Sequence, residues 1–244
     1  MTGPGLSLGQ VARYFRQQGE LGGPELFLGE LNRDQVLALA MRREGSESGS
    51  IQGPKDRSGG TEDYESLRQE ALACQKCFLA RTRSNVVFSD GNPQARLMVV
   101  GEAPGAQEDK TGLAFVGPAG KLLDLLLASV DLSRESSAYI CNVLKCRPPG
   151  NRNPVPEEML ECTPFLRRQI ELVSPEAILA VGAFSAQFLT GKALPLGQLR
   201  GEVYSYHGVP VVITYHPAAL LRNPGWTRAT WEDLQLLRQV MDGA

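Results

Sequence analysis

Residues 96–117 read RLMVVGEAPGAQEDKTGLAFVG, an apolar run that stops at Gly101 and passes into a polar, glycine-rich segment. Buried parallel strands read as continuous apolar runs, because helices cover both of their faces. Similar runs at 138–142, 176–182 and 209–214 alternate with helical patterns at 64–73, 120–130, 156–173, 183–190 and 230–241. The alternation predicts a three-layer α/β/α domain around a mostly parallel, four-stranded sheet.

Polar segments follow three of the apolar runs, after Val100, Ile140 and Ile213. In a parallel sheet of this kind, binding sites lie beyond the carboxyl ends of the strands. We therefore expect the chemistry of the protein in these three loops.

The composition of the 244 residues, 42% hydrophobic and 21% charged, is typical of a soluble globular protein. No apolar run approaches the ~20 residues of a membrane span, and no secretion signal is evident, so we expect a cytoplasmic protein. The net charge of −2 argues against a protein that coats nucleic acid, but it permits a local basic rim. Five cysteines, an odd number, favour metal ligands over a set of disulfides.

Residues 1–62 differ from the rest of the chain. Helical spacing at 6–18 and 32–43 predicts a helical extension over 1–44, and the Ser- and Gly-rich composition of 45–62 predicts a flexible linker. The α/β domain then occupies 63–244. We expect residues 1–62 to serve as a tether or as a docking element for a protein partner.

Four of the cysteines have spacing that suits a shared metal site. Cys74 and Cys77 form a C-x-x-C pair, Cys146 lies in a loop after a strand, and Cys162 lies on the next helix. This is not the repeated short pair of a zinc ribbon, and a 4Fe–4S cluster accepts irregular spacing, but spacing alone leaves zinc open. Cys141 falls inside a strand, where we expect a buried, inert thiol.

The glycine-rich segment after Gly101 exposes backbone N–H groups that can hold an anion or a carbonyl oxygen. It is neither a Walker loop nor a dinucleotide fingerprint. Within it, Phe115 fits two roles equally well, a core side chain or a platform on which a base stacks.

Two further polar residues stand at strand ends. The Asn142 amide offers a donor and an acceptor, which suits either the edge of a pyrimidine or a link between two loops. His216 follows the last strand; an isolated histidine is more often structural, but its position level with the other loops favours a role in the site. His207 falls in a predicted turn and is taken as incidental.

Taken together, three segments and the positions of the four cysteines resemble family 4 uracil-DNA glycosylases. The segments are GEAPGAQEDKTGLAFVGPAGKLL (101–123), NVLKCRPPGNRNP (142–154) and HPAALLRNP (216–224). The resemblance covers about 63–241. It implies a monofunctional glycosylase that removes uracil from single- or double-stranded DNA and leaves an abasic site for base excision repair. It also implies a 4Fe–4S cluster on Cys74, Cys77, Cys146 and Cys162, and favours iron over zinc more strongly than spacing does.

The resemblance assigns roles within a pocket for a flipped uracil. Phe115 would stack on the ring, Asn142 would read its polar edge, and His216 would stabilise the departing anion. The backbone of Glu102, Ala103 and Pro104 would line the pocket, with the Ala103 N–H as a donor. Glu108 would exclude the methyl group of thymine, which a hydrophobic pocket alone discriminates poorly.

Other assignments concern water and DNA. Better-known members of the superfamily have a carboxylate where this chain has Ala103, which leaves Asn151 to orient the water. Leu220 and Leu221 would wedge into the duplex, Arg222 would contact phosphate, and positive charge would come from Lys145, Arg147 and Arg152. We expect a monomer.

Three alternatives stay open. The first is a glycosylase with a broadened range of deaminated bases, such as hypoxanthine and xanthine. The second is a non-catalytic iron–sulfur module that binds nucleic acid and is tethered by residues 1–62. The third is a zinc-stabilised nucleotide-binding protein.

Overall fold

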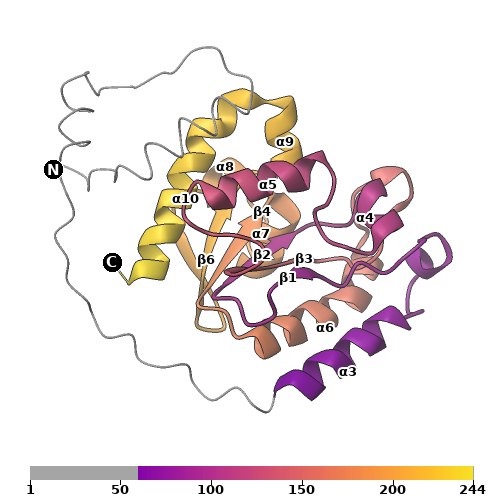
Figure 1. The fold of residues 1–244 in the computed structure, drawn as a ribbon. Helices are drawn as coiled ribbons and strands as arrows, with labels where there is room; N and C mark the ends of the chain where they lie inside the picture. The colour runs from indigo at the N-terminus through magenta and orange to yellow at the C-terminus, as the bar shows by residue number, and fades with distance from the viewer. Residues whose placement is uncertain (1–59, 244) are drawn as a thin grey trace, which may run out of the picture.

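The fold was obtained as a computed structural model that describes residues 60–243 (Figure 1). The helices expected at 6–18 and 32–43, and most of the expected linker, lie outside the described residues. The first described helix, α3, runs from Gly60 to Leu72 and so begins before the domain boundary expected at residue 63.

A single mixed sheet forms the centre of the fold, with the strand order β1-β3-β2-β4-β6-β5. Its four central strands are parallel, as predicted: β2 (Leu97–Gly101), β3 (Ala138–Asn142), β4 (Ala177–Val181) and β6 (Val209–Thr214). The two edge strands, β1 (Asp90–Gly91) and β5 (Val203–Tyr206), are antiparallel to their neighbours. The α/β class is thus confirmed.

The predicted count of four strands is wrong, since the sheet has six strands within residues 60–243. Strand β1 has two residues, too few for any periodic pattern. Strand β5 is a partly exposed edge and therefore lacks the continuous apolar run of the central strands. It joins β6 through His207 and Gly208, both at positive φ, which is the geometry of a tight hairpin turn.

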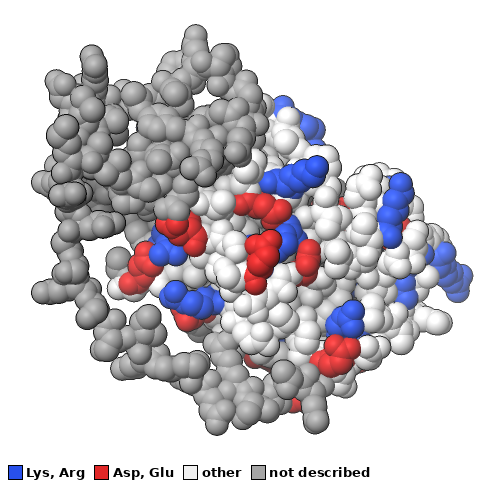
Figure 2. Space-filling view, viewed as in Figure 1, with Lys and Arg blue, Asp and Glu red and all other residues white. Residues whose placement is uncertain are grey.

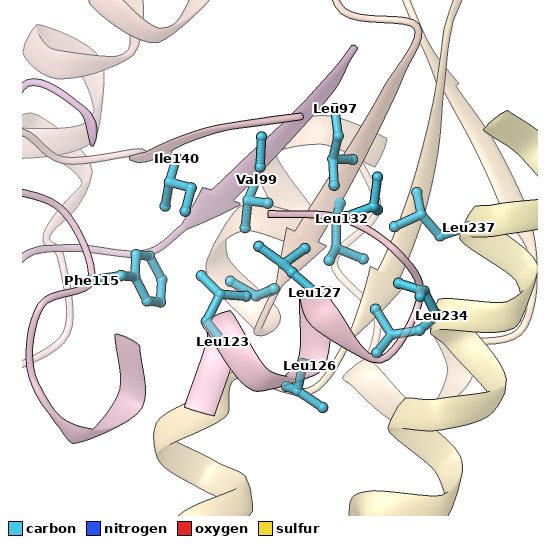
Figure 3. Packing of buried hydrophobic residues seen from close by; sticks show 14 of the residues in the cluster. Leu97, Val99, Phe115, Leu123, Leu126, Leu127, Leu132, Ile140, Leu234 and Leu237 are labelled. Carbon is cyan, nitrogen blue, oxygen red and sulfur yellow. The ribbon is translucent and has the colours of Figure 1, made fainter. Parts of the chain in front are cut away.

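Helices cover both faces of the sheet. On one face lie α5 (Pro118–Ala128), α9 (Pro217–Arg222) and α10 (Thr227–Asp242); on the other lie α3, α6 (Pro156–Val173), α7 (Ala183–Thr190) and α8 (Leu196–Leu199). Successive residues of β2 enter opposite cores. Leu97 and Val99 pack with α5 and α10 (Figure 3), whereas Met98 and Val100 pack with α6 and α7. This is the alternation that a strand buried on both faces produces.

Short elements at the carboxyl ends of the strands complete the domain. They are α4 (Ala106–Thr111) after β2, and the 3-10 turns η1 (Phe78–Arg81), η2 (Pro149–Asn151) and η3 (Pro224–Trp226). A small separate core of Leu79, Val86, Leu144 and Cys146 lies beneath η1. Among the described residues, no helix has the length and apolar character needed to cross a membrane.

Candidate active site

A cavity of about 360 Å³ opens at the carboxyl ends of β2, β3 and β6. Loops distant in sequence form its walls because parallel strands deliver their ends to one edge of the sheet. Every residue that the sequence assigned to catalysis or to base binding lines this cavity. The complete lining is Glu102, Ala103, Pro104, Gly105, Glu108, Phe115, Ala119, Asn142, Pro148, Asn151, Arg152, His216, Ala218, Ala219 and Arg222.

Asn142, the last residue of β3, brings an unsatisfied acceptor to the cavity. Its side chain is 1% exposed, and Oδ1 has no hydrogen-bond partner among the described residues. Burying such an atom costs free energy unless a ligand provides the missing bond. The neighbouring residue on β2 is Gly101, and a Cβ there would lie 2.4 Å from Oδ1 and 2.6 Å from the Phe115 ring. Glycine is therefore what lets the amide and the ring approach each other.

Phe115 is held in an unusual backbone conformation, with φ +53°. A β-carbon at Gly120 would fall 1.7 Å from the Phe115 carbonyl oxygen, so α5 packs directly on this peptide. The ring is 5% exposed, belongs to the core next to α5, and also lines the cavity. The core role expected as one alternative is confirmed, and the stacking role stays a prediction.

His216 is the N-cap residue that precedes helix α9, and its ring stacks on that of Phe115 with centroids 5.5 Å apart. Its Nδ1 accepts a hydrogen bond from the Ala218 N–H at 3.1 Å. Burial, and secondarily the positive charge of Arg222, lower the pKa of His216 to about 4, against the opposing effect of Glu108. The ring is therefore neutral near pH 7, and since Nδ1 accepts, Nε2 carries the proton.

Glu108, on α4, is fixed by three backbone donors. Oε2 accepts from the Gly105 N–H at 3.1 Å, and Oε1 accepts from the N–H groups of Val116 and Gly117, each at 3.0 Å. The carboxylate thus holds the loop that contains Phe115 against α4. It forms an immobile part of the cavity wall.

Two other polar residues complete the wall. Burial raises the pKa of the half-buried Glu102 carboxyl, which follows directly after β2. Asn151, with φ +55°, accepts a hydrogen bond at Oδ1 from Arg147 Nε at 2.7 Å. One N–H of Arg147 therefore orients the Asn151 amide, and the contact of Arg147 with DNA stays a prediction.

Two of the predicted DNA contacts, those of Leu220 and Lys145, are wrong. Leu220 is only 3% exposed and packs in the core, whereas Leu221 is 48% exposed. One residue turns the helix by about 100°, so that only one of the two leucines can face out. Lys145 is 2% exposed and its Nζ donates to the Asn142 carbonyl at 2.6 Å, so it supports the strand end rather than reaching solvent.

Arg222 and Arg152 do lie at the cavity. Arg152 donates two hydrogen bonds to the Glu158 carboxylate, at 2.9 and 2.5 Å, and its side chain is still 39% exposed. A cation with one carboxylate partner keeps further N–H donors available for phosphate.

The four cysteines singled out by their spacing surround one small cavity beneath η1. Cys146 Sγ accepts a hydrogen bond from Arg83 Nη1, and Cys162 Sγ accepts one from the Lys145 backbone N–H, each at 3.1 Å. Within residues 60–243, no three Cys, His, Asp or Glu side chains are grouped as they would be around a single metal ion. Cys141 is fully buried in a different core, as expected.

Sequence reasoning missed one residue that organises the site. Arg134 lies between α5 and β3, outside all the motifs, and its Nη1 and Nη2 donate to the carbonyl oxygens of Ala114 and Phe115, each at 2.8 Å. It also pairs with Asp90 and Asp124. No pattern in the sequence signals this role, because the acceptors are backbone atoms.

Comparison with known proteins gives a consistent match. The model of the uracil DNA glycosylase superfamily matches residues 88–235. The type-4 uracil-DNA glycosylase of Archaeoglobus fulgidus is 44% identical over 67% of this chain and 85% of its own length. The type-4 enzyme of Thermotoga maritima is 46% identical over 65% of this chain and 83% of its own length. The type-5 uracil-DNA glycosylase of Pyrobaculum aerophilum is 37% identical over 62% of this chain and 73% of its own length.

Proposed function

Because the chain belongs to the uracil DNA glycosylase superfamily, we propose that it hydrolyses the N-glycosidic bond of uracil in DNA and leaves an abasic site for base excision repair. The type-4 enzymes that align with most of the α/β domain support this substrate. The observation that carries the proposal is the buried, unpartnered Oδ1 of Asn142 in a cavity that also contains an aromatic face and a neutral imidazole.

Recognition begins when the uracil nucleotide leaves the stack and enters the cavity. The N3–H of uracil donates to Asn142 Oδ1, and the amide nitrogen donates to the adjacent carbonyl oxygen. Phe115 covers one face of the ring. The absence of any other partner for Oδ1 among the described residues supports this assignment.

Bond cleavage sends the C1′–N1 electron pair into the base, so that negative charge develops on a carbonyl oxygen of uracil while the sugar gains oxocarbenium character. His216 Nε2–H donates to that oxygen, and its neutral state at pH 7 follows from the lowered pKa. A water oxygen then bonds to C1′ and loses a proton, which the departing uracil anion takes up directly or through solvent. Asn151, held by Arg147, orients this water.

Discrimination against thymine falls to Glu108. Its carboxylate, fixed by three backbone N–H groups, cannot swing aside for an added methyl group at C5. An immobile wall rejects a methyl group more strongly than a soft apolar pocket does.

The four cysteine thiolates, Cys74, Cys77, Cys146 and Cys162, would hold a 4Fe–4S cluster with a structural role. The donor set fits the group, because four thiols line one cavity and two of them already accept N–H···S hydrogen bonds, as cluster ligands do. The cluster would tie α3 and η1 to the loop after β3.

DNA binding would use the exposed rim of the cavity. Leu221 would fill the space that the flipped nucleotide leaves, and Arg222 and Arg152 would contact phosphates. These contacts are local, which agrees with an overall charge of −2.

Cleavage of an oligonucleotide with one uracil, followed by alkali, tests the proposal against an otherwise identical thymine strand. Breaks at uracil alone are expected. Breaks at hypoxanthine or xanthine as well would indicate the broadened range, and no breaks from a folded, iron-containing protein would indicate a non-catalytic module. Elemental analysis that finds zinc in place of iron would exclude the cluster.

A further inference from the structure

A second surface with nucleic-acid-binding chemistry lies beside the cysteine cavity. In η1, Leu79 is buried but the preceding Phe78 is 57% exposed, which is unusual for a phenylalanine in a soluble domain. An open hollow at this turn is lined by Lys76, Phe78, Arg81 and Arg83, among others. An exposed aromatic ring among cations is the combination that binds single-stranded nucleic acid.

Hydrogen bonds link the segment that lines this hollow to the walls of the active site. Arg83 donates to Cys146, and the next residue, Arg147, holds Asn151 in the cavity wall. On its other side, the N–H of Ser84 donates to the Asp109 carboxylate at 2.9 Å, beside Glu108 on α4. Residues 83–85 therefore connect the segment that follows η1 to two walls of the cavity.

The charge on this surface is largely uncompensated. The side chain of Arg81 is exposed and forms no hydrogen bond or ion pair with a described residue. The only carboxylate paired with Lys76 in the described part of the chain is Glu70, at 3.5 Å, with both side chains 49% exposed, which makes a weak contact. Figure 2 shows basic side chains at the edge of the molecule where η1 lies in Figure 1.

We propose that the η1 surface, defined as Lys76, Phe78 and Arg81, binds the uracil-containing strand beyond the flipped nucleotide, in single-stranded form. Phe78 stacks on an unpaired base, and the two cations contact flanking phosphates. Single-stranded DNA is the occupant because the base faces of a duplex are already covered by their neighbours, which leaves an aromatic ring nothing to stack on. The inference rests on the proposed function and deepens it by extending the substrate site along one strand.

The test compares KM and kcat for Phe78→Ala and Arg81→Ala on single strands with one uracil and either long or minimal flanks. Leu194→Ala and Arg96→Ala are the controls, because both residues are exposed, and Arg96 precedes β2, at the edge of the sheet opposite the cavity. Phe78→Ala should raise KM on the long strand by about 5- to 100-fold, with kcat and the short substrate unchanged. Phe78→Tyr should restore the wild-type KM, and Arg81→Ala should reduce the salt slope of binding by about 0.7.

Equal KM values for wild type and Phe78→Ala on the long strand would overturn the inference. An equal rise in KM on the long and the short substrate would overturn it as well. Fluorescence anisotropy with a labelled single strand that contains thymine separates this result from a failure of the proposed function. If the protein does not cleave at uracil but its affinity for that strand still depends on Phe78, the inference about the η1 surface holds and the proposed function is wrong.

Discussion

Arg134 Nη2 donates a hydrogen bond of 2.8 Å to the carbonyl oxygen of Phe115, the aromatic residue whose φ is +53°. A non-glycine residue in the left-handed region is strained by about 1 kcal/mol or more, and it persists only where its surroundings enforce it. Two carbonyls held by one guanidinium, and the close packing of Gly120, provide that enforcement.

Arg134→Lys should therefore lower kcat for uracil removal by about tenfold or more, because an ammonium cannot reproduce the planar fork that holds both carbonyls. Steady-state kinetics would show this, with Leu237→Ala as a control that destabilises the core away from the cavity. If both variants lose stability but neither loses kcat, Arg134 serves the fold alone.

Gly101→Ala should abolish most activity while the protein still folds. The added Cβ would lie 2.4 Å from Asn142 Oδ1 and 2.6 Å from the Phe115 ring, and both groups would have to move by more than the cavity tolerates. Gly197→Ala is the matched control, since a Cβ there meets nothing within 4 Å. Equal activity of the two variants would show that the amide and the ring need no fixed separation.

Asn142→Ala and His216→Leu should each fold normally. Removal of a donor aimed at developing charge typically costs about 100- to 1,000-fold in rate, and we expect His216→Leu to fall in that range. Single-turnover cleavage of a uracil oligonucleotide measures the loss, and thermal unfolding checks the fold. A wild-type rate in either variant would contradict the assignment of the cavity.

The pKa of His216 also predicts how stability depends on pH. The value of about 4 lies below the ordinary 6.5, so between these values the unfolded chain binds a proton that the folded chain does not. The stability that this residue contributes is present above pH 6.5 and is lost as pH falls toward 4, by about 3 kcal/mol in all. Denaturant unfolding at pH 7 and pH 4.5 should show a smaller loss for His216→Leu than for wild type.

The parallel strands and most helices followed from apolar periodicity because buried strands and long helices impose it along the chain. Both α6 and α7 have the predicted bounds. The edge strand β5 lacked that signal because half of it faces solvent. The residues that the motifs assigned to catalysis and base binding line one cavity, but the motifs did not show that Lys145 folds inward or that Leu220 faces the core, since a motif does not specify which way a side chain turns.

Cys146→Ala tests the proposed cluster through both metal content and stability. Loss of one of four thiolates should remove most of the iron and destabilise the packing of α3 and η1 on the loop after β3, because the other thiols cannot hold the cluster alone. Iron analysis and thermal unfolding measure the two effects. Cys141→Ala is the control, since that buried thiol lies in a separate core and should leave the iron content unchanged. Full iron content in Cys146→Ala would contradict Cys146 as a ligand of the cluster.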